Sequence, residues 1–178
     1  VRQLEAGVAR AARLVEQLLA LARAERGGSR EHEPVALHDV AREVLEEMLP
    51  LADGRGIDLG MERADSVRVA GDRDALRVLV RNLLDNAVRY TPPGGEVEVS
   101  VRPAEGGVSL TVVDNGPGIP EAERGQVFER FHRVLGSGEA GSGLGLSIVR
   151  RIADLHRAGV SLEAGLGGRG LRVEVSFP

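Results

Sequence analysis

Apolar residues recur every three to four positions in four stretches of the chain, which predicts four helices. In the first stretch the apolar positions alternate at spacings of four and three, the pattern of a coiled coil or helix bundle. Pro50 is expected to end the second helix, and Asp72 or Asp74 to cap the third. A further short helix is expected after Pro120. The four stretches are residues 1–26, 37–49, from the cap to about Tyr90, and 144–157.

Shorter stretches alternate apolar and polar residues, which predicts strands. Most of these strands come as hairpins, joined by glycine-rich turns. The sequence therefore predicts an α+β fold, a two-layer α/β sandwich with a mixed, mostly antiparallel sheet that has helices on one face and is preceded by one long helix. The expected hairpins join 96–102 to 108–113 and 160–164 to 171–177, the single strands are 57–61 and 67–69, and residues 31–35 around Pro34 are expected to be a polar connector.

The first helix has an apolar stripe that it cannot bury alone, so it requires a partner. The sequence Gly27-Gly28-Ser29 directly after it favours a separate bundle element. The alternative is an N-terminal helix that packs on its own domain. We therefore expect two units, residues 1–28 and residues 29–178. The chain opens directly on this helix with Val1 in place of Met, which indicates a fragment of a longer protein.

Composition excludes several kinds of site. The 178 residues include 27 acidic and 23 basic side chains, a net charge of −4, which disfavours nucleic acid as the main partner. Cysteine is absent, which removes disulfides, thiolate zinc sites and cysteine nucleophiles. Every basic residue is Arg, so a P-loop lysine and a lysine Schiff base are impossible. No apolar run approaches the roughly 18 residues of a membrane span, and no signal peptide is visible.

The third helix carries an unusual polar stripe. Asn82, Asn86 and Arg89 share one face at spacings of four and three, beside the apolar face. Asparagine is a poor residue for a helix interior because its amide competes for the backbone. A Mg²⁺ ion binds carbonyl oxygens, and a polyphosphate binds Arg, so this stripe is a candidate metal and phosphate site. The alternative is an exposed polar stripe that is merely tolerated.

Three loop segments supply further candidates, each with a structural alternative. The first, 114–120, begins with Asp114 after an apolar strand and permits close approach to a ligand; the alternative is an ordinary Asx turn. The second, 141–146, places three alternating glycines before a helix whose N-terminal amides favour phosphate; the alternative is a flexible surface loop. The third, 128–133, carries two Phe and two Arg, as expected of a lid over an anion; the alternative is an apolar cluster under a loop.

The order and spacing of these segments resemble the catalytic ATP-binding domain of sensor histidine kinases, within the gyrase, Hsp90, histidine kinase and MutL superfamily. Residues 81–92 look like the N box, 114–119 like the G1 box, 128–133 like the F box and 141–146 like the G2 box. Residues 14–23 look like the end of the second dimerisation helix. The resemblance covers essentially the whole chain and implies the Bergerat-type ATP-binding fold.

The resemblance also implies roles for the matched positions, with ATP or ADP and Mg²⁺ as cofactors. Asn86 holds Mg²⁺ through its side-chain oxygen, Asn82 lines the same site, and Arg89 neutralises phosphate charge. Tyr90 packs on the adenine or ribose, Asp114 accepts the adenine amino group, and Gly118 leaves room for the ring. Arg133 and Arg130 reach the γ-phosphate from the lid, which makes Asn82 and Arg133 the candidate catalytic residues. The other nucleotide-binding candidates are Gly116, Ile119, Ser142, Gly143, Leu144, Gly145 and Leu146.

The sequence departs from this family in three places. His132 stands where Tyr is frequent, so the resemblance assigns it no part in lid packing. Arg157 stands where the family usually has Gly after a Leu-His pair, so the last helix is expected to end differently. No histidine has the neighbours of a phosphoacceptor, so the acceptor helix is expected to be absent, and the fragment is expected to bind ATP but not to phosphorylate itself. We expect all four histidines to be ordinary surface or capping residues; they are His32, His38, His132 and His156.

The resemblance implies a histidine kinase of two-component signal transduction. Its expected partners are its own dimerisation domain with the acceptor histidine, a response regulator, and a second copy in the full-length homodimer, without nucleic acid. The expected location is the cytoplasmic side of an inner-membrane sensor protein. The alternatives are an ATP-hydrolysing relative and a nucleotide-sensing module. Position 82 distinguishes a histidine kinase from the ATP-hydrolysing relative. Hydrolytic relatives have Glu there as a base for water, and this chain has Asn.

Overall fold

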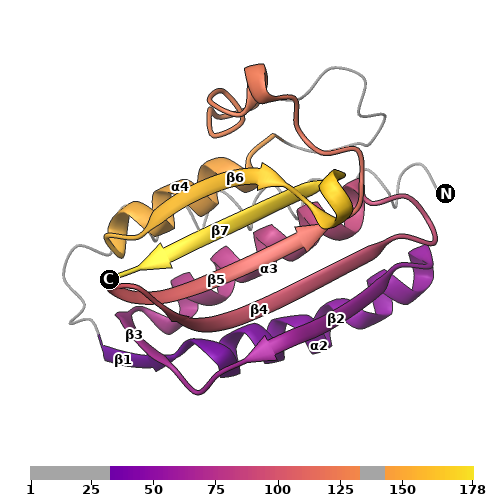
Figure 1. The fold of residues 1–178 in the computed structure, drawn as a ribbon. Coiled ribbons are helices and arrows are strands. Elements are labelled where there is room, and N and C mark those ends of the chain that lie inside the picture. Colours follow the sequence, from indigo (N-terminus) through magenta and orange to yellow (C-terminus); the bar gives the residue numbers. More distant parts are fainter. Residues whose placement is uncertain (1–32, 133–142) are drawn as a thin grey trace, which may run out of the picture.

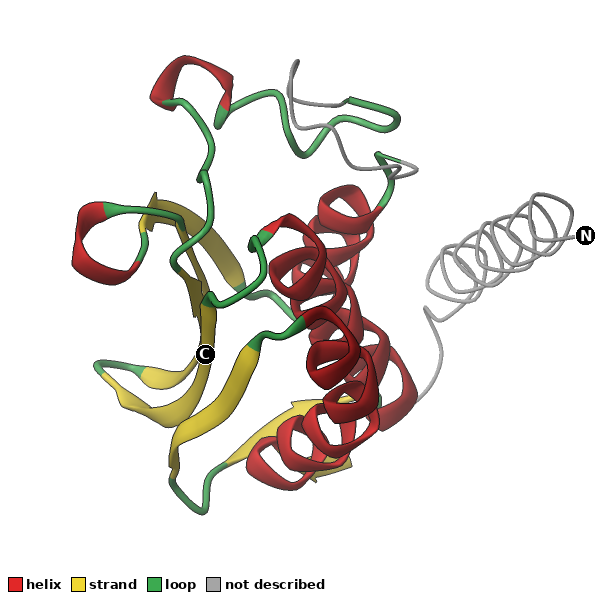
Figure 2. Cartoon of the chain, turned by 90° about the vertical axis from the view of Figure 1, so that its right-hand side faces the viewer, coloured by secondary structure: helices red, strands yellow, loops and turns green. Residues whose placement is uncertain are grey.

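Three helices cover one face of a five-stranded sheet in the computed structural model, which describes residues 33–132 and 143–178 (Figures 1 and 2). The sheet has the order β2-β4-β5-β7-β6, and a second, two-stranded sheet pairs β1 with β3. The elements are β1 (Glu33–Ala36), α2 (Leu37–Arg55), β2 (Asp58–Ala64), β3 (Arg68–Gly71), α3 (Arg73–Tyr90), β4 (Glu96–Ala104), β5 (Gly107–Asp114), η1 (Glu121–Glu123), α4 (Gly145–Leu155), β6 (Gly159–Ala164), η2 (Leu166–Gly168) and β7 (Leu171–Phe177).

The pairing in the larger sheet confirms the expected α+β two-layer architecture. Strand β2 runs parallel to β4, and the other three pairs are antiparallel. Both expected hairpins form, β4 with β5 and β6 with β7. The expected first helix at 1–26 lies outside the described residues, so the division into units 1–28 and 29–178 stays a prediction.

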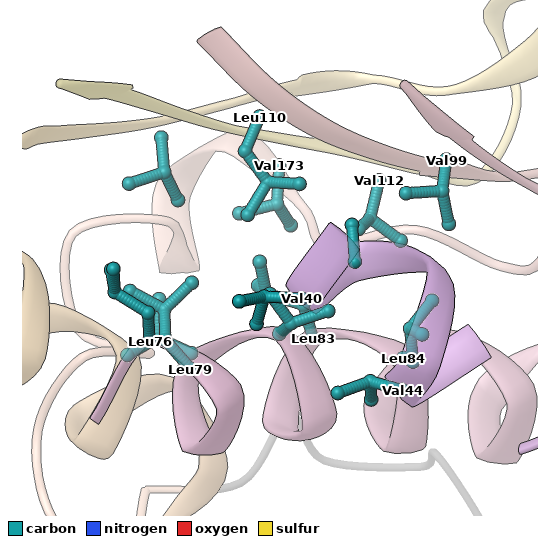
Figure 3. Packing of buried hydrophobic residues seen from close by; sticks show 14 of the residues in the cluster. Val40, Val44, Leu76, Leu79, Leu83, Leu84, Val99, Leu110, Val112 and Val173 are labelled. Carbon is teal, nitrogen blue, oxygen red and sulfur yellow. The ribbon is translucent and has the colours of Figure 1, made fainter. Parts of the chain in front are cut away.

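The core lies between the sheet and the layer formed by α2, α3 and α4. Alternate residues of β4, β5 and β7 point toward the helices, and Figure 3 shows Val99, Leu110, Val112 and Val173 facing Leu83 and its neighbours. Helix α3 packs against both α2 and α4, so it is the central helix of the layer. Its N-cap is Asp72, whose carboxylate accepts hydrogen bonds from the backbone N–H groups of Asp74 and Ala75. This fully buried helix face fixes the orientation of the adjacent polar stripe.

Two sequence expectations near the start of the domain are wrong. Helix α2 does not end at Pro50 but continues to Arg55, because Pro50 lies on the exposed side while Met48 and Ala52 remain buried against the core. The residues around Pro34 form strand β1 instead of a polar connector, since β3 supplies an antiparallel partner. Both local signals are overridden by packing that comes from distant parts of the chain.

Helix α4 ends at Leu155 in a turn that places Arg157 in the left-handed region, with φ of 55°. The N–H of Arg157 donates to Asp154 O (3.1 Å) and the N–H of Ala158 donates to Ala153 O (2.9 Å). These are the two hydrogen bonds of a Schellman motif, in which glycine is the preferred residue at the left-handed position. The helix therefore ends in the motif that a glycine favours, with an arginine in the strained place.

Candidate functional site

The polar stripe of α3 meets the glycine loop at the first residue of α4. Asn86 is half-buried, and a Cβ built on Gly145 would lie 2.9 Å from its Oδ1 and 3.0 Å from its Nδ2. Asn82, one turn earlier, is only 8 % exposed, and its Nδ2 donates to Val78 O (2.8 Å). The side-chain amide of Asn86 thus lies close to the first residue of α4, and a side chain at position 145 would require Asn86 to move.

The first turn of α4 has no side-chain cap within the part of the chain that the structure describes. Leu144 occupies the N-cap, so no N-cap side chain accepts hydrogen bonds from the N–H groups of that turn. Ser147 does not serve them either, because its hydroxyl donates to Leu144 O (2.8 Å). Gly145 and Leu146 are half-buried at this helix start. A helix N-terminus without a side-chain cap carries partial positive charge and suits a phosphate.

Asp114 lies at the end of β5 and is only 6 % exposed. Its Oδ1 accepts two backbone hydrogen bonds, from the N–H of Gly116 (2.9 Å) and of Leu171 (3.2 Å). Burial raises the pKa of this carboxyl, and the two hydrogen bonds oppose that rise. Because both bonds go to Oδ1, Oδ2 is the oxygen that can accept a hydrogen bond from a ligand.

The turn between β6 and β7 surrounds Asp114. A Cβ on Gly165 or Gly170 would approach Asp114 O more closely than the 3.0 Å that real Cβ atoms keep. A Cβ on Gly118, whose φ is 73°, would lie 2.4 Å from Gly170 O, which is also too close. Gly118 thus has a structural reason to lack a side chain, and its expected role beside the adenine ring stays a prediction. The sequence alone did not indicate that this turn belongs to the site, although its run of glycines was a possible signal.

The G1 segment also contacts the end of α3. A Cβ on Gly116 would lie 3.0 Å from Tyr90 O and 3.0 Å from Asp114 Oδ1, so both residues border one glycine. Tyr90 and Ile119 are half-buried, and Ile119 O accepts a hydrogen bond from Arg124 Nε (3.2 Å). The end of β5, the last turn of α3 and the turn before β7 lie at the same end of the sheet (Figure 1). The structure therefore brings the N box and the G1 box together.

Arg89 is already engaged in an ion pair. Its Nε lies 2.6 Å from Asp85 Oδ2 on the same helix, and its backbone carbonyl accepts a hydrogen bond from Arg55 Nη2 (2.8 Å). Arg89 can thus reach a phosphate only by sharing its guanidinium with Asp85 or leaving it. Neither Asp85 nor Arg55 was singled out by the sequence, since neither belongs to the polar stripe.

The F box packs on α4 and on the glycine loop. The guanidinium of Arg150 lies 5.7 Å from the centre of the Phe128 ring, and the N–H of Phe131 donates to Gly143 O (2.9 Å). Phe131 has φ of 65° and is 68 % exposed, and Arg130 is exposed. Arg133 and Ser142 lie outside the described residues. The contacts that are described support an anchored segment beside the start of α4.

The expectation that all four histidines are surface or capping residues holds for His156 only in its second half. His156 is the C-cap of α4, as a capping residue should be, but it is only 5 % exposed and therefore belongs to the core. Its Nε2 lies 3.0 Å from the backbone N of Asp72, and its Nδ1 lies 2.7 Å from Ile152 O. His38 is half-buried with its Nδ1 3.3 Å from Val67 O, His132 is half-buried with its Nε2 3.6 Å from Glu123 Oε2, and His32 lies outside the described residues.

The sequence model of the family described as "Histidine kinase-, DNA gyrase B-, and HSP90-like ATPase" matches residues 71–178, which is more than half of the chain. The chain belongs to this family. The match runs from the start of α3 to the C-terminus and thus contains every described part of the site. The family confirms the resemblance stated above and implies that the domain binds a nucleotide.

Similar proteins of this family are sensor kinases. The sensor protein kinase PmrB of Pseudomonas aeruginosa is 42 % identical over 99 % of this chain, which spans 37 % of the length of PmrB. The solved mycobacterial sensor histidine kinase MprB is 34 % identical, with a TM-score of 0.73 over 83 % of this chain and 97 % of that one. The full-length ShkA structure in complex with AMPPNP is 30 % identical, with a TM-score of 0.78 over 93 % of this chain and 35 % of that one.

Two further observations limit what else this ATPase-family domain contains. Within residues 33–132 and 143–178, no group of three or more His, Asp or Glu side chains could hold a metal ion on its own. No helix in these same ranges is long and apolar enough to cross a membrane.

Proposed function

We propose that this chain is the ATP-binding catalytic domain of a sensor histidine kinase. In this proposal it binds Mg-ATP and transfers the γ-phosphate to a histidine on the dimerisation domain, for relay to a response regulator. The observation that carries the proposal is the close approach of Asn86 to Gly145, which brings an amide oxygen to a helix start where the described residues supply no side-chain cap. Phosphoryl transfer depends mainly on positioning and charge neutralisation, and this junction provides both.

The residues present fit a magnesium ion that is shared with the nucleotide. Mg²⁺ is usually held by one or two protein oxygens together with substrate phosphates and water, instead of a cage of protein ligands. Asn86 supplies one side-chain oxygen at the place where the phosphates meet α4, and Asn82 lines the same side of α3. When bound, the ion neutralises charge on the phosphates. The protein's part is to hold the amide oxygen of Asn86 beside the start of α4.

Adenine recognition falls to Asp114 in this proposal. Its Oδ1 is committed to Gly116 and Leu171, which orients Oδ2 as an acceptor for the exocyclic amino group of adenine. A carboxylate has no donor, so guanine, which presents a carbonyl at the equivalent position, is disfavoured. Tyr90, Gly116 and Ile119 border the same region, where Tyr90 packs on the adenine or ribose.

The phosphates meet amides and arginines in this proposal. The backbone N–H groups of Gly143, Leu144, Gly145 and Leu146 face them from the loop and helix start, together with Ser142. Arg89 neutralises phosphate charge from α3, which requires that its ion pair with Asp85 be shared or broken. Arg130 and Arg133 reach the γ-phosphate from the F box. Arginine suits this work because its guanidinium pairs with phosphate oxygens in a bidentate manner.

Transfer to a protein is favoured over hydrolysis by the residue at position 82. A hydrolytic relative uses Glu there to take a proton from water, and an amide cannot accept that proton. The Nδ2 of Asn82 is moreover held by Val78 O, which fixes the side chain in place. An ATP-hydrolysing or nucleotide-sensing relative is thus the second candidate and not the first.

The proposal includes partners that the chain does not contain. They are the dimerisation domain with the acceptor histidine, a second copy of the full-length protein, and a response regulator. We place the domain on the cytoplasmic side of an inner-membrane sensor protein. The sequence similarity to the sensor kinase PmrB supports these inferences.

Two measurements, made one after the other, test the proposal. Calorimetric titration of the chain with ADP should show binding that strengthens when Mg²⁺ is added. Mixing the chain with labelled ATP and a dimerisation domain that carries the acceptor histidine should then label that domain in an acid-labile form, as expected of phosphohistidine. Binding without transfer would favour the nucleotide-sensing alternative, and steady phosphate release without transfer would favour the hydrolytic one.

A further inference from the structure

Helices α3 and α4 run in opposite directions and touch at both ends. At one end Asn86, in the last turns of α3, contacts Gly145 at the start of α4. At the other end His156, directly after α4, contacts Asp72 directly before α3. The two contacts are separated by the length of α4, about 16 Å for eleven residues. The proposed function uses the first contact and leaves the second unexplained.

The contact between His156 and Asp72 has a defined donor and acceptor. The backbone N–H of Asp72 can only donate, so His156 Nε2 must accept this hydrogen bond (3.0 Å). Ile152 O can only accept, so the proton of the neutral ring lies on Nδ1 and is donated to it (2.7 Å). The ring also packs edge-on against Phe177, at 6.4 Å between centroids. One buried side chain thus links the end of α4, the start of α3 and the last strand.

Gly71, directly before Asp72, lies against the imidazole of His156. A Cβ on Gly71 would lie 2.6 Å from His156 Cδ2 and 2.7 Å from Nε2, so the ring fills the space that a side chain would need. Asp72 is also the N-cap of α3, with its carboxylate bound to the N–H groups of Asp74 and Ala75. The imidazole therefore contacts the residue at which α3 is anchored.

We propose that His156 is a positioning residue that fixes how far α4 lies along α3, and thereby places the first turn of α4 against Asn86 to receive phosphate. A helix is stiff along its axis, so a shift at its C-terminal end moves the N-terminal end by a similar amount. Loss of the hydrogen bond between His156 and Asp72 removes phosphate contacts, whereas Asp114, on β5, stays in place to bind adenine. This inference rests on the proposed function and adds a residue that touches no ligand.

The test compares two amides that each keep half of the imidazole's hydrogen bonding. In His156→Gln the side-chain oxygen reaches the position of Nε2 and still accepts from Asp72. In His156→Asn the shorter amide stays near the position of Nδ1 and can only serve Ile152 O. Hydrogen exchange of the Asp72 amide shows whether its hydrogen bond to residue 156 is present. The exchange should be slow in the wild type and in the Gln variant, and faster in the Asn variant.

The measurement is the ratio of the dissociation constants for ADP and adenosine, both determined by NMR titration with Mg²⁺ present. In His156→Asn the ADP affinity should fall about three- to tenfold, the equivalent of one hydrogen bond, while the adenosine affinity is unchanged. His156→Gln should keep the wild-type ratio. A merely structural role would weaken both ligands equally, so an unchanged ratio in His156→Asn overturns the proposal.

Gly71→Ala provides a second route to the same result. Its Cβ displaces the imidazole from Asp72 without changing His156, so it should lower ADP affinity selectively even if His156→Asn does not fold. An unchanged ratio in Gly71→Ala, with faster exchange of the Asp72 amide, overturns the inference as well. Wild-type chain that binds adenosine and ADP equally, or neither, overturns the proposed function itself, and the two failures are thereby distinguished.

Discussion

The backbone N–H of Leu171 donates a hydrogen bond to Asp114 Oδ1 (3.2 Å), although the two residues are 57 positions apart in the chain. The first residue of β7 therefore orients the carboxylate at the end of β5. Since Gly116 donates to the same oxygen, the carboxylate is held through Oδ1 by two segments at once, and neither of these hydrogen bonds uses Oδ2. The geometry separates the oxygen that stabilises the fold from the oxygen that is proposed to recognise adenine.

Asp114→Asn should therefore preserve the fold and lose adenine recognition. The amide keeps Oδ1 for Gly116 and Leu171, and it replaces Oδ2 by an NH₂ group that faces the donor of adenine. We expect ADP affinity to fall by about tenfold or more while the melting temperature stays equal or rises. Thermal unfolding and calorimetric titration measure the two quantities. Asp114→Ala, which removes both oxygens, is the control and should lower both.

The raised pKa of Asp114 has a consequence for the pH dependence of stability. Burial raises the folded-state pKa above that of an unfolded Asp, about 3.9, so the native state binds the proton first as the pH falls. The contribution of Asp114 to the free energy of unfolding therefore increases as the pH falls from the raised pKa to about 3.9. An ion-paired Asp, whose folded-state pKa is lowered, shows the opposite trend. ADP affinity should decrease over the same range, because the protonated carboxyl loses its acceptor.

Unfolding free energies and ADP affinities measured across this range in wild type and Asp114→Asn isolate the effect. The difference in stability between the two should narrow as the pH falls, because protonation removes the cost of the buried charge. A difference that widens toward acid would mean that the carboxylate is stabilised in the fold, in conflict with its burial.

Asn86→Ala should remove the magnesium dependence of nucleotide binding. The alanine methyl remains compatible with Gly145, so the fold is expected to persist, and only the amide oxygen is lost. We expect ADP affinity with Mg²⁺ to fall by about tenfold or more, toward the value without Mg²⁺. Titrations with and without the ion measure this. If magnesium still strengthens binding to the same degree, Asn86 does not hold the metal.

The parts of the site that sequence alone could predict are those held by local signals. The polar stripe of α3 follows from helical spacing, and the hairpins follow from alternation and turn residues, because neighbouring residues decide both. Strand β1 could not be predicted, because Pro34 reads as a loop until β3 provides a partner. The buried state of His156 was equally hidden, since its partner, Asp72, is 84 positions away.

The glycines before β7 are another feature whose role depends on contacts with a distant part of the chain. Residues 165–170 look like an ordinary hairpin connection, and nothing in the local sequence connects them to Asp114. The structure shows that Gly170 is required because it approaches Asp114 O, whereas Gly168 lies in open space. Sequence identifies the turn, and only the packing identifies which of its glycines supports the site.

These two glycines form a matched pair for mutation. Both have left-handed φ, 81° for Gly168 and 72° for Gly170, so alanine at either position costs about 1 kcal/mol of backbone strain. Gly168→Ala should cost only that, since nothing lies within 4 Å. Gly170→Ala should cost about 2 kcal/mol more, because its Cβ collides with the backbone of Asp114. Chemical denaturation measures the difference, and equal costs would contradict the proposed close packing around Asp114.

Arg157→Gly should stabilise the domain. Arg157 occupies the left-handed position of the Schellman motif that ends α4, which costs an L-residue about 1–2 kcal/mol, and glycine removes this cost. Glycine also raises the entropy of the unfolded chain, which offsets part of the gain. We expect a net increase of about 0.5–1 kcal/mol in the free energy of unfolding. Arg151→Gly, inside α4, is the control for loss of an arginine and should destabilise by about 1 kcal/mol. A lower melting temperature for Arg157→Gly would mean that Arg157 makes contacts that outweigh its backbone strain.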